Sequence, residues 1–346
     1  MIGDESFEPA IVKIGETLIG EKQPVFIIAE IGINHDGSFD KCVDLIEAAA
    51  ASGADAVKLQ TINAEDSYVT GTISHAEFKG KEFSVSQLAK LVDLSRQLNV
   101  LLFSTPGDFL DLDMMVDAGM CAVKVSSGLM TNLPLIAEIG KKNLPVIIST
   151  GMAYEDEIKT AVSTSLENGS PGVVLLKCTA LYPAPEHLIN LRAIATMRKQ
   201  FDLAVGYSDH TLGSLACLSA VALGATVIEK HFTLDKTLKG ADHGISMEPA
   251  EFSQMVSSIR RIESLLGYEE IHPTKEEISV RGERHRCLVA RQDIAEGELF
   301  TRENLALKRP SPGSAGLSPE HFKSVINRRA AMSIPINTPI TKKEVQ

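Results

Sequence analysis

Short runs of apolar and β-branched residues recur along the first three quarters of the 346-residue chain. Eight of them predict strands, at residues 25–29, 56–59, 100–103, 122–125, 146–148, 173–176, 204–205 and 226–228. The intervening segments have the apolar spacing of helices, as at residues 42–51 and 214–223. Strand and helix therefore alternate, and the near-continuous apolar strands are typical of a parallel sheet that is covered on both faces.

Eight βα units predict an α/β fold in which the strands close into a (β/α)8 TIM barrel. An open doubly wound sheet is disfavoured because no glycine-rich phosphate loop follows any strand. Gly32 and Gly37 lie near the end of the first strand, but their spacing does not match a dinucleotide-binding motif. Gly53, Gly119 and Gly224 are expected to end the helices that precede them.

The alternating pattern stops near residue 270, which is the expected end of a barrel domain over residues 1–270. Residues 271–284 are polar and charged and contain Pro273, so they are expected to form a linker. Residues 285–346 have short alternating runs separated by glycine and proline. This pattern predicts a small C-terminal domain that is rich in β-structure.

Composition narrows the classes of partner and compartment. The formal net charge of -11 argues against nucleic acid, which is bound by clustered Lys and Arg. The five cysteines form no Cys-x-x-Cys pair, as expected for a protein of a reducing compartment. The N-terminal residues include Asp4, Glu5 and Glu8, unlike a signal peptide, and no apolar run is long enough to span a bilayer. We therefore expect a cytoplasmic protein that does not contact a membrane.

Polar side chains follow or end all eight predicted strands. In this fold the C-terminal ends of the strands carry the reactive groups. The residues at these positions are Glu30, Lys58, Gln60, Ser104, Thr105, Lys124, Ser126, Ser127, Ser149, Thr150, Lys177, Thr179, Ser208, Asp209, His210, Glu229, Lys230 and His231. One such residue alone is more often structural or solvated than functional. Eight strand ends with the same character predict a site for a small phosphorylated or carboxylated substrate, which lysines and hydroxyls bind.

Two histidines suggest a metal. His210 and His231 end the last two strands, which are neighbours in a closed barrel, and Glu30 on the first strand lies beside them. Two distant histidines also occur as ordinary hydrogen-bonded residues, so the signal is of moderate specificity. An imidazole pair with its other positions open suits Mn²⁺ or a similar divalent ion that polarises a carbonyl.

Several segments resemble the sialic acid (N-acetylneuraminate) synthase family, including legionaminic acid synthases, pseudaminic acid synthases and spore-coat polysaccharide relatives. The segments are residues 28–37 (IAEIGINHDG), 53–60 (GADAVKLQ), 103–106 (FSTP), 148–151 (ISTG), 182–185 (YPAP), 206–210 (GYSDH), 228–232 (IEKHF) and 240–243 (GADH). Residues 293–297 (DIAEG) and 307–310 (LKRP) resemble the antifreeze-like, or SAF, domain of that family. The resemblance covers nearly the whole chain after the first twenty residues.

The resemblance implies an enzyme that condenses phosphoenolpyruvate with an open-chain N-acetylhexosamine, such as N-acetylmannosamine. The product is a 2-keto-3-deoxy nonulosonate such as N-acetylneuraminate, and phosphate leaves with cleavage of a C–O bond. Mn²⁺ is the expected metal, with Mg²⁺ or Co²⁺ as alternatives, and the expected assembly is a domain-swapped homodimer.

The resemblance also assigns roles to residues of this chain. The implied phosphoenolpyruvate contacts are Lys58, Thr105, Lys124, Ser127, Ser149, Tyr182 and Ser208. His210 and His231 would bind the metal, and Glu30 would handle water or a proton. Gln60 and Asp242 would face the sugar, which Arg309 would reach from the small domain of a partner subunit.

Two positions depart from the family pattern. Leu129 stands where the family commonly has an acidic residue that contacts the sugar, and Ala180 stands where sialic acid synthases often have Asn. The acceptor sugar is therefore left open. Two other functions compete with condensation: an aldolase that uses Lys124 or Lys177 as a Schiff-base nucleophile, and a carbohydrate-binding module carried on an inactive barrel. The paired histidines count against the aldolase, and the intact polar strand ends count against the inactive barrel.

Overall fold

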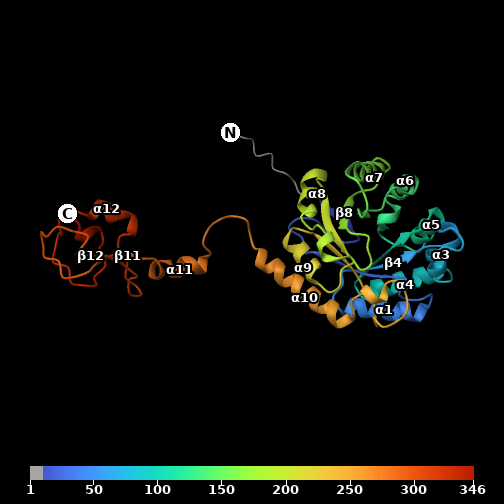
Figure 1. Cartoon of the computed structure of the whole chain (residues 1–346), viewed down its shortest axis with the longest axis horizontal. Helices are drawn as coiled ribbons and strands as arrows, with labels where there is room; N and C mark the ends of the chain where they lie inside the picture. The colour runs from blue at the N-terminus through green and yellow to red at the C-terminus, as the bar shows by residue number, and fades with distance from the viewer. Residues whose placement is uncertain (1–10) are drawn as a thin grey trace. The chain divides into compact units, whose positions relative to one another are not determined.

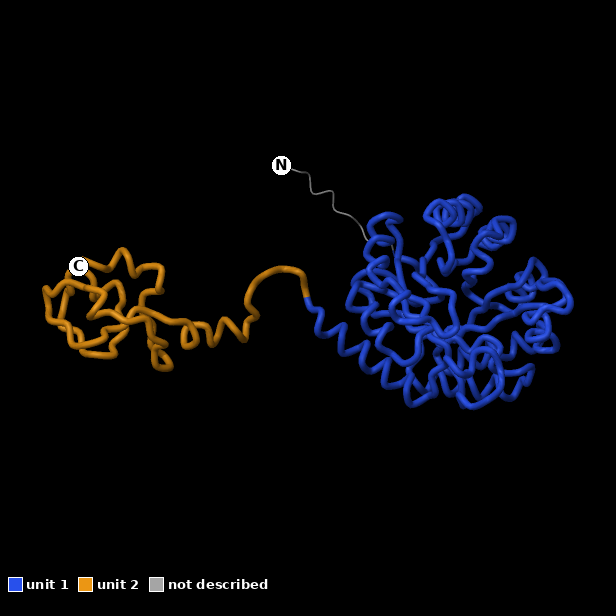
Figure 2. Tube along the Cα trace, in the orientation of Figure 1, with its two compact units in different colours: residues 1–267 blue, residues 268–346 orange. Residues whose placement is uncertain are grey.

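The computed structural model describes residues 11–346. Asp4, Glu5 and Glu8, on which the expectation about a signal peptide rests, lie outside the described residues. The chain divides into two compact units, residues 1–267 and residues 268–346 (Figure 2). Each unit has its own hydrophobic core and is described by itself.

The first unit is a closed barrel of eight parallel strands in the order β10-β3-β4-β5-β6-β7-β8-β9 (Figure 1). The strands are β3 (Phe26–Gly32), β4 (Ala56–Thr61), β5 (Leu101–Pro106), β6 (Val123–Val125), β7 (Val146–Ser149), β8 (Val173–Cys178), β9 (Ala204–Asp209) and β10 (Val227–His231). Every predicted run overlaps one of them, so the predicted fold class is confirmed. β9 and β10 continue beyond the predicted ends because their polar residues still pair in the backbone ladder, as Lys230 does with Asp209.

Helices surround the barrel and follow its strands. They are α1 (Phe39–Ala51), α2 (Ala64–Ser67), α3 (Ile73–Phe78), α4 (Val85–Gln97), α5 (Phe109–Asp117), α6 (Leu133–Lys141), α7 (Glu155–Glu167), α8 (Ala193–Phe201), α9 (Leu215–Ala222) and α10 (Pro249–Leu266). Three short 3-10 helices are η1 (Ser127–Leu129), η2 (Glu186–Leu188) and η3 (His243–Ile245). Gly53 follows α1 at φ 89°, a conformation that favours glycine, and so confirms the predicted helix end.

The core of this unit has two layers because side chains alternate along each strand. One set, including Phe26, Phe103 and Val174, fills the barrel interior. The other set packs between the strands and the helices. A hairpin of β1 (Val12–Ile14) and β2 (Thr17–Ile19) adds apolar side chains to the interior set, since Val12 and Ile14 belong to the same cluster. The hairpin thus extends the apolar packing inside the barrel.

The second unit begins with α11 (Lys275–Arg284), which occupies most of the segment predicted as a linker. The other elements are β11 (Cys287–Ala290), β12 (Leu305–Lys308), η4 (Pro319–His321), α12 (Phe322–Val325) and η5 (Lys342–Glu344). β11 and β12 pair antiparallel, and isolated bridges such as Ile294 with Ile334 extend the β-structure. Leu288, Phe300 and Ile340 are buried in its core.

No helix among residues 11–346 is both long enough and apolar enough to cross a membrane.

Candidate active site

The barrel brings most of the predicted site residues to the C-terminal ends of its strands. They are Glu30 on β3, Lys58 and Gln60 on β4, Thr105 on β5, Lys124 on β6, Ser127 in η1, Ser149 on β7, Tyr182 after β8, Ser208 on β9, His210 after β9, His231 on β10 and Asp242 before η3. Arg309 is the exception, because it follows β12 in the second unit, where it is exposed. The proposed role of Arg309 stays a prediction.

Lys58 and Glu30 form a buried ion pair inside the barrel. Lys58 Nζ lies 2.8 Å from Glu30 Oε2, and Lys58 is 3% exposed. Gln60 Nε2 donates to Glu30 Oε1 at 3.1 Å, and Lys58 Nζ donates to Thr105 Oγ1 at 3.4 Å. Burial lowers the pKa of Lys58 to about 8, although the nearby Glu229 carboxylate raises it. The ammonium group is therefore mostly charged at pH 7, but it loses its proton about one pH unit higher.

Lys124 lies on the next strand but one and is also buried. Its Nζ donates to Ser149 Oγ at 2.7 Å and to the Val125 carbonyl oxygen at 3.1 Å. Burial lowers the pKa of Lys124, and Glu229 opposes that effect. A hydrogen bond thus connects two predicted phosphoenolpyruvate residues on neighbouring strands, Lys124 on β6 and Ser149 on β7.

Glu229 is a central residue that the sequence placed among the polar strand ends without an individual role. Its Oε1 accepts a hydrogen bond from Ser208 Oγ at 2.8 Å. Lys58 Nζ lies 3.9 Å from its Oε2, and Lys124 Nζ lies 3.9 Å from its Oε1. Burial opposes ionisation, but Lys124 and Lys58 hold the pKa of Glu229 at about 2. One carboxylate thus links three residues that were predicted to bind phosphoenolpyruvate.

The alternation of side chains along β10 is the signal that could have identified Glu229. Glu229 lies two residues before His231, so both side chains are on the same face of the strand. Lys230 lies between them and is on the opposite face. If His231 faces the reactive site, Glu229 does too.

The two histidines are brought together as predicted, with a tyrosine beside them. The ring centroids of His210 and His231 are 5.3 Å apart. Tyr182 stacks on His210 at 4.0 Å and meets His231 edge-on at 5.9 Å. Asp242 Oδ2 lies 3.6 Å from His231 Nδ1. The proposed metal ligands therefore adjoin two residues that were predicted to contact the substrates.

Each of the two imidazoles has a ring nitrogen that a divalent metal could use. His210 Nδ1 donates to the Thr179 carbonyl oxygen at 2.9 Å, which leaves Nε2 as the nitrogen that can face a cation. Burial favours the neutral ring, but Cys178 and the Thr179 carbonyl oxygen raise the pKa of His210, so a cation would compete with a proton there. His231 Nδ1 is buried and has no hydrogen-bond partner among the described residues. Burial is the main cause that lowers the pKa of His231 to about 4, so this ring is neutral at pH 7. His231 can therefore offer a lone pair to a cation directly, and His210 can do so once its ring has lost a proton.

The chain would supply few of the ligands. Within residues 11–346 no group of three or more His, Cys, Asp or Glu side chains is arranged to hold a metal ion. Two imidazoles would leave the other coordination positions for water and substrate, as in catalytic metal sites.

Two positions after β6 and β8 have apolar side chains. Leu129 is half-buried and packs against the core between strands and helices. Ala180 lies close to Gly151, where an added Cβ would come 3.2 Å from the Ala180 Cβ atom. Ser127 Oγ accepts a hydrogen bond from the Gly151 backbone at 3.0 Å. Neither Leu129 nor Ala180 offers a polar side-chain atom here.

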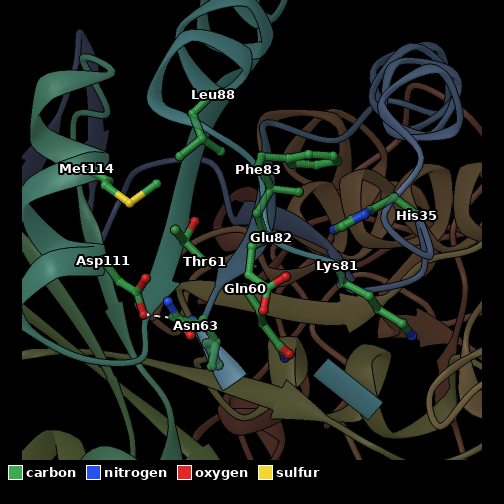
Figure 3. Close-up of a pocket in the computed structure, with 12 residues that line it drawn as sticks. His35, Gln60, Thr61, Asn63, Lys81, Glu82, Phe83, Leu88, Asp111 and Met114 are labelled. Carbon is green, nitrogen blue, oxygen red and sulfur yellow. Dashed lines mark hydrogen bonds between the residues drawn. The ribbon is translucent and has the colours of Figure 1, made fainter. Parts of the chain in front are cut away.

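A pocket opens beside the end of β4 (Figure 3). Its empty volume is about 440 Å³, and Gln60 and Phe83 are among the residues that line it. Asp111 lies on one wall, and its Oδ2 accepts hydrogen bonds from the Asn63 and Gly107 backbones, each at 3.1 Å. Asp111 thereby ties the loops after β4 and β5 together. Gln60, a predicted sugar contact, has this pocket on one side and Glu30 on the other.

A closed parallel barrel with buried lysines, carboxylates and paired histidines at the C-terminal strand ends defines the class of α/β-barrel enzymes. Residues 45–271 match the NeuB family, and residues 285–346 match the SAF domain. This chain belongs to the NeuB family, and the resemblance seen in its motifs is confirmed.

Two relatives and one solved structure are similar to this chain over most of its length. The chain is 37% identical to the N,N'-diacetyllegionaminic acid synthase of Legionella pneumophila, over 94% of this chain and 96% of that protein. It is 39% identical to the enzyme of the same name from Campylobacter jejuni, over 86% and 93%. The crystal structure of an N-acetylneuraminic acid (sialic acid) synthetase from Leptospira borgpetersenii, in complex with citrate, is similar with a TM-score of 0.75 and 37% identity. That match covers 78% of this chain and 95% of that chain.

Proposed function

We propose that this chain condenses phosphoenolpyruvate with an open-chain diacetamido-trideoxyhexose to form a nonulosonic acid and inorganic phosphate. The observation that carries the proposal is the cluster of Lys58, Lys124 and Glu229 beside the histidine pair. The cluster supports an anionic substrate, and the histidines support activation of a carbonyl next to it.

Phosphoenolpyruvate has two anionic groups that need separate partners. Lys58 and Lys124 supply two buried ammonium groups, and Thr105 and Ser149 supply hydroxyls within hydrogen-bonding distance of them. Charged donors bind phosphate and carboxylate strongly where water is largely excluded. On binding, these lysines would exchange part of their pairing with Glu30 and Glu229 for the substrate.

Glu30 is placed to handle the water that the reaction consumes. Carbon 3 of phosphoenolpyruvate forms a bond to the sugar aldehyde carbon, water adds to carbon 2, and phosphate leaves with the bridging oxygen. Lys58 and Gln60 hold the Glu30 carboxylate at 2.8 Å and 3.1 Å, so its position is fixed for orienting this water or accepting its proton. A divalent metal bound by His210 and His231, with Mn²⁺ as the first choice, would supply Lewis-acid polarisation of the aldehyde.

The acceptor proposal rests on the apolar side chains at positions 129 and 180, after β6 and β8. Leu129 cannot accept a hydrogen bond from a sugar hydroxyl, and Ala180 cannot replace an Asn side chain. Leaving a buried hydroxyl without its partner costs about 1 to 3 kcal/mol. A sugar with fewer hydroxyls and a second acylamino group avoids this cost. The names of the two legionaminic acid synthase relatives point in the same direction.

The proposal includes a homodimer in which Arg309 serves the site of the partner subunit. Apolar side chains are exposed after several strands of the barrel, including Met152 at 74% and Leu212 at 63%. Surface of this kind suits burial in an interface. A C₂ arrangement lets both subunits contribute Arg309 at once.

The Schiff-base alternative has weaker support. Lys124 donates to Ser149 and to a backbone carbonyl, and Lys177 donates to the Cys178 carbonyl oxygen at 2.8 Å and to Thr179 Oγ1 at 3.1 Å. These acceptors stabilise the ammonium form, but burial lowers the pKa of both lysines, so the histidine pair is the main argument against the aldolase. Borohydride with pyruvate should trap no adduct, whereas a trapped lysine would favour the aldolase.

The acceptor is tested by comparing kcat/KM for a panel of open-chain acetamido sugars at fixed phosphoenolpyruvate. A diacetamido-trideoxyhexose should exceed N-acetylmannosamine by roughly tenfold or more, as expected for about 1 to 3 kcal/mol of discrimination. Leu129→Glu should narrow the difference, and Ile136→Val, a buried change on α6, is the matched control. If N-acetylmannosamine is the best acceptor of the panel, the acceptor proposal is wrong.

A further inference from the structure

A second buried ion pair lies behind the histidines, on the opposite face of the same two strands. Lys230 Nζ is 2.7 Å from Asp209 Oδ2, and neither side chain is measurably exposed. Tyr207 and Ile228 are on the same faces of β9 and β10 and belong to the core between strands and helices. The pair therefore lies outside the barrel interior and contacts no predicted substrate residue directly.

The pair is the centre of a network that encloses His210 on both sides. Asp209 Oδ1 accepts hydrogen bonds from the Thr211 backbone and from the Tyr207 hydroxyl, each at 2.9 Å. Asp209 Oδ2 accepts from Thr211 Oγ1 at 3.1 Å and from Cys217 Sγ at 3.3 Å. Lys230 also donates to the Thr211 carbonyl oxygen. The backbone before and after His210 is thereby fixed.

The same network reaches His231. Lys230 precedes His231 on β10 and pairs with Asp209 in the strand register. The contact from Lys230 to Thr211 crosses from β10 to the residue that follows His210. The Lys230 side chain therefore connects the backbone next to His231 with the backbone next to His210.

We propose that Asp209 and Lys230 are positioning residues that hold His210 and His231 at the separation needed to share one divalent cation. The inference rests on the proposed metal role of the two histidines. A stabilising role alone explains the pair poorly, because a buried ion pair can often be replaced by apolar residues without loss of stability. Replacing residues that orient metal ligands, in contrast, weakens metal affinity.

The test uses the variant Asp209→Asn/Lys230→Met in the full chain. Asn keeps an acceptor oxygen for Thr211 and Tyr207, and Met occupies the space of the lysine stem, so no unpaired buried charge remains. Mn²⁺ binding is measured by electron paramagnetic resonance titration without substrates, and thermal unfolding is followed without metal. The control is Ser104→Ala, which removes a buried tie between β4 and β5, the 2.8 Å bond to the Thr61 backbone.

The expected result is Mn²⁺ affinity weakened about 10- to 100-fold in the double variant, the usual effect of losing residues that orient metal ligands. The double variant should lose no more in unfolding temperature than Ser104→Ala does. Ser104→Ala should bind Mn²⁺ with the affinity of the wild type. Wild-type affinity in the folded double variant would overturn this inference alone. Absence of Mn²⁺ binding by the wild type would overturn the proposed metal role and this inference with it.

A second variant decides the matter if the double variant does not fold. Tyr207→Phe removes one hydrogen bond to Asp209 and leaves the ion pair in place. Mn²⁺ affinity weakened by threefold or more would support the inference, and unchanged affinity would overturn it.

Discussion

Replacement of Glu229 by Gln tests whether the two lysines of the site depend on one carboxylate for their charge. The change removes a negative charge 3.9 Å from each ammonium group and keeps an acceptor for Ser208. Two unit charges at this separation interact by about 4 kcal/mol at an effective dielectric constant of about 20. Loss of the attraction disfavours the charged lysine, so the pKa of Lys58 must fall.

Glu30 remains beside Lys58 at 2.8 Å and compensates for part of this loss. Since about 1.4 kcal/mol corresponds to one pH unit, we expect the titration of Lys58 to move down by roughly one to two pH units. The wild-type pKa is about 8. Glu229→Gln should therefore convert a lysine that is mostly charged at neutral pH into one that is at least about half neutral there.

The assay is kcat/KM for phosphoenolpyruvate between pH 6 and 10, which reports groups of the free enzyme. In the wild type it should fall above about pH 8, as Lys58 loses its proton. In Glu229→Gln the fall should begin about one to two pH units lower. Glu229→Asp keeps the charge and should retain most of the wild-type profile. An unmoved profile in a folded Glu229→Gln enzyme would refute the electrostatic role given to Glu229.

Two further predictions concern the metal and the second unit. Chelation should abolish activity and Mn²⁺ restore it, and His210→Ala or His231→Ala should lower turnover by roughly a hundredfold; full activity in excess chelator would contradict this. Arg309→Ala should weaken use of the sugar more than use of phosphoenolpyruvate. If Arg309 acts on the partner's site, mixing the Arg309→Ala and Glu30→Ala variants should restore activity after subunit exchange. Proven heterodimers without activity would argue against a role of Arg309 in the partner's site.

The barrel was predictable because its strands are buried on both faces, which leaves uninterrupted apolar runs in the sequence. The hairpin of β1 and β2 leaves no such pattern, since each strand has three residues and Leu18 and Lys13 are exposed. Its apolar side chains are recognisable as part of the barrel core from their packing alone.

The site was predictable in its location, but its division between two faces follows only once the histidines are assigned to the interior. Ser208 and Asp209 are adjacent polar residues, as are Glu229 and Lys230, so composition does not indicate which of each pair faces the interior. The structure puts Ser208 and Glu229 among the reactive lysines and joins Asp209 to Lys230 behind them. Side-chain alternation along β9 and β10 decides between these arrangements, because Ser208 and Glu229 each lie two residues before a histidine of the site.

The most direct test of the proposed function uses phosphoenolpyruvate with ¹⁸O in the bridging position, a diacetamido-trideoxyhexose and Mn²⁺, with mass spectrometry of both products. The account predicts a keto acid that contains the carbon atoms of both substrates, and the label in the released phosphate. Label in the keto acid, or phosphate release without a carbon–carbon bonded product, would contradict it.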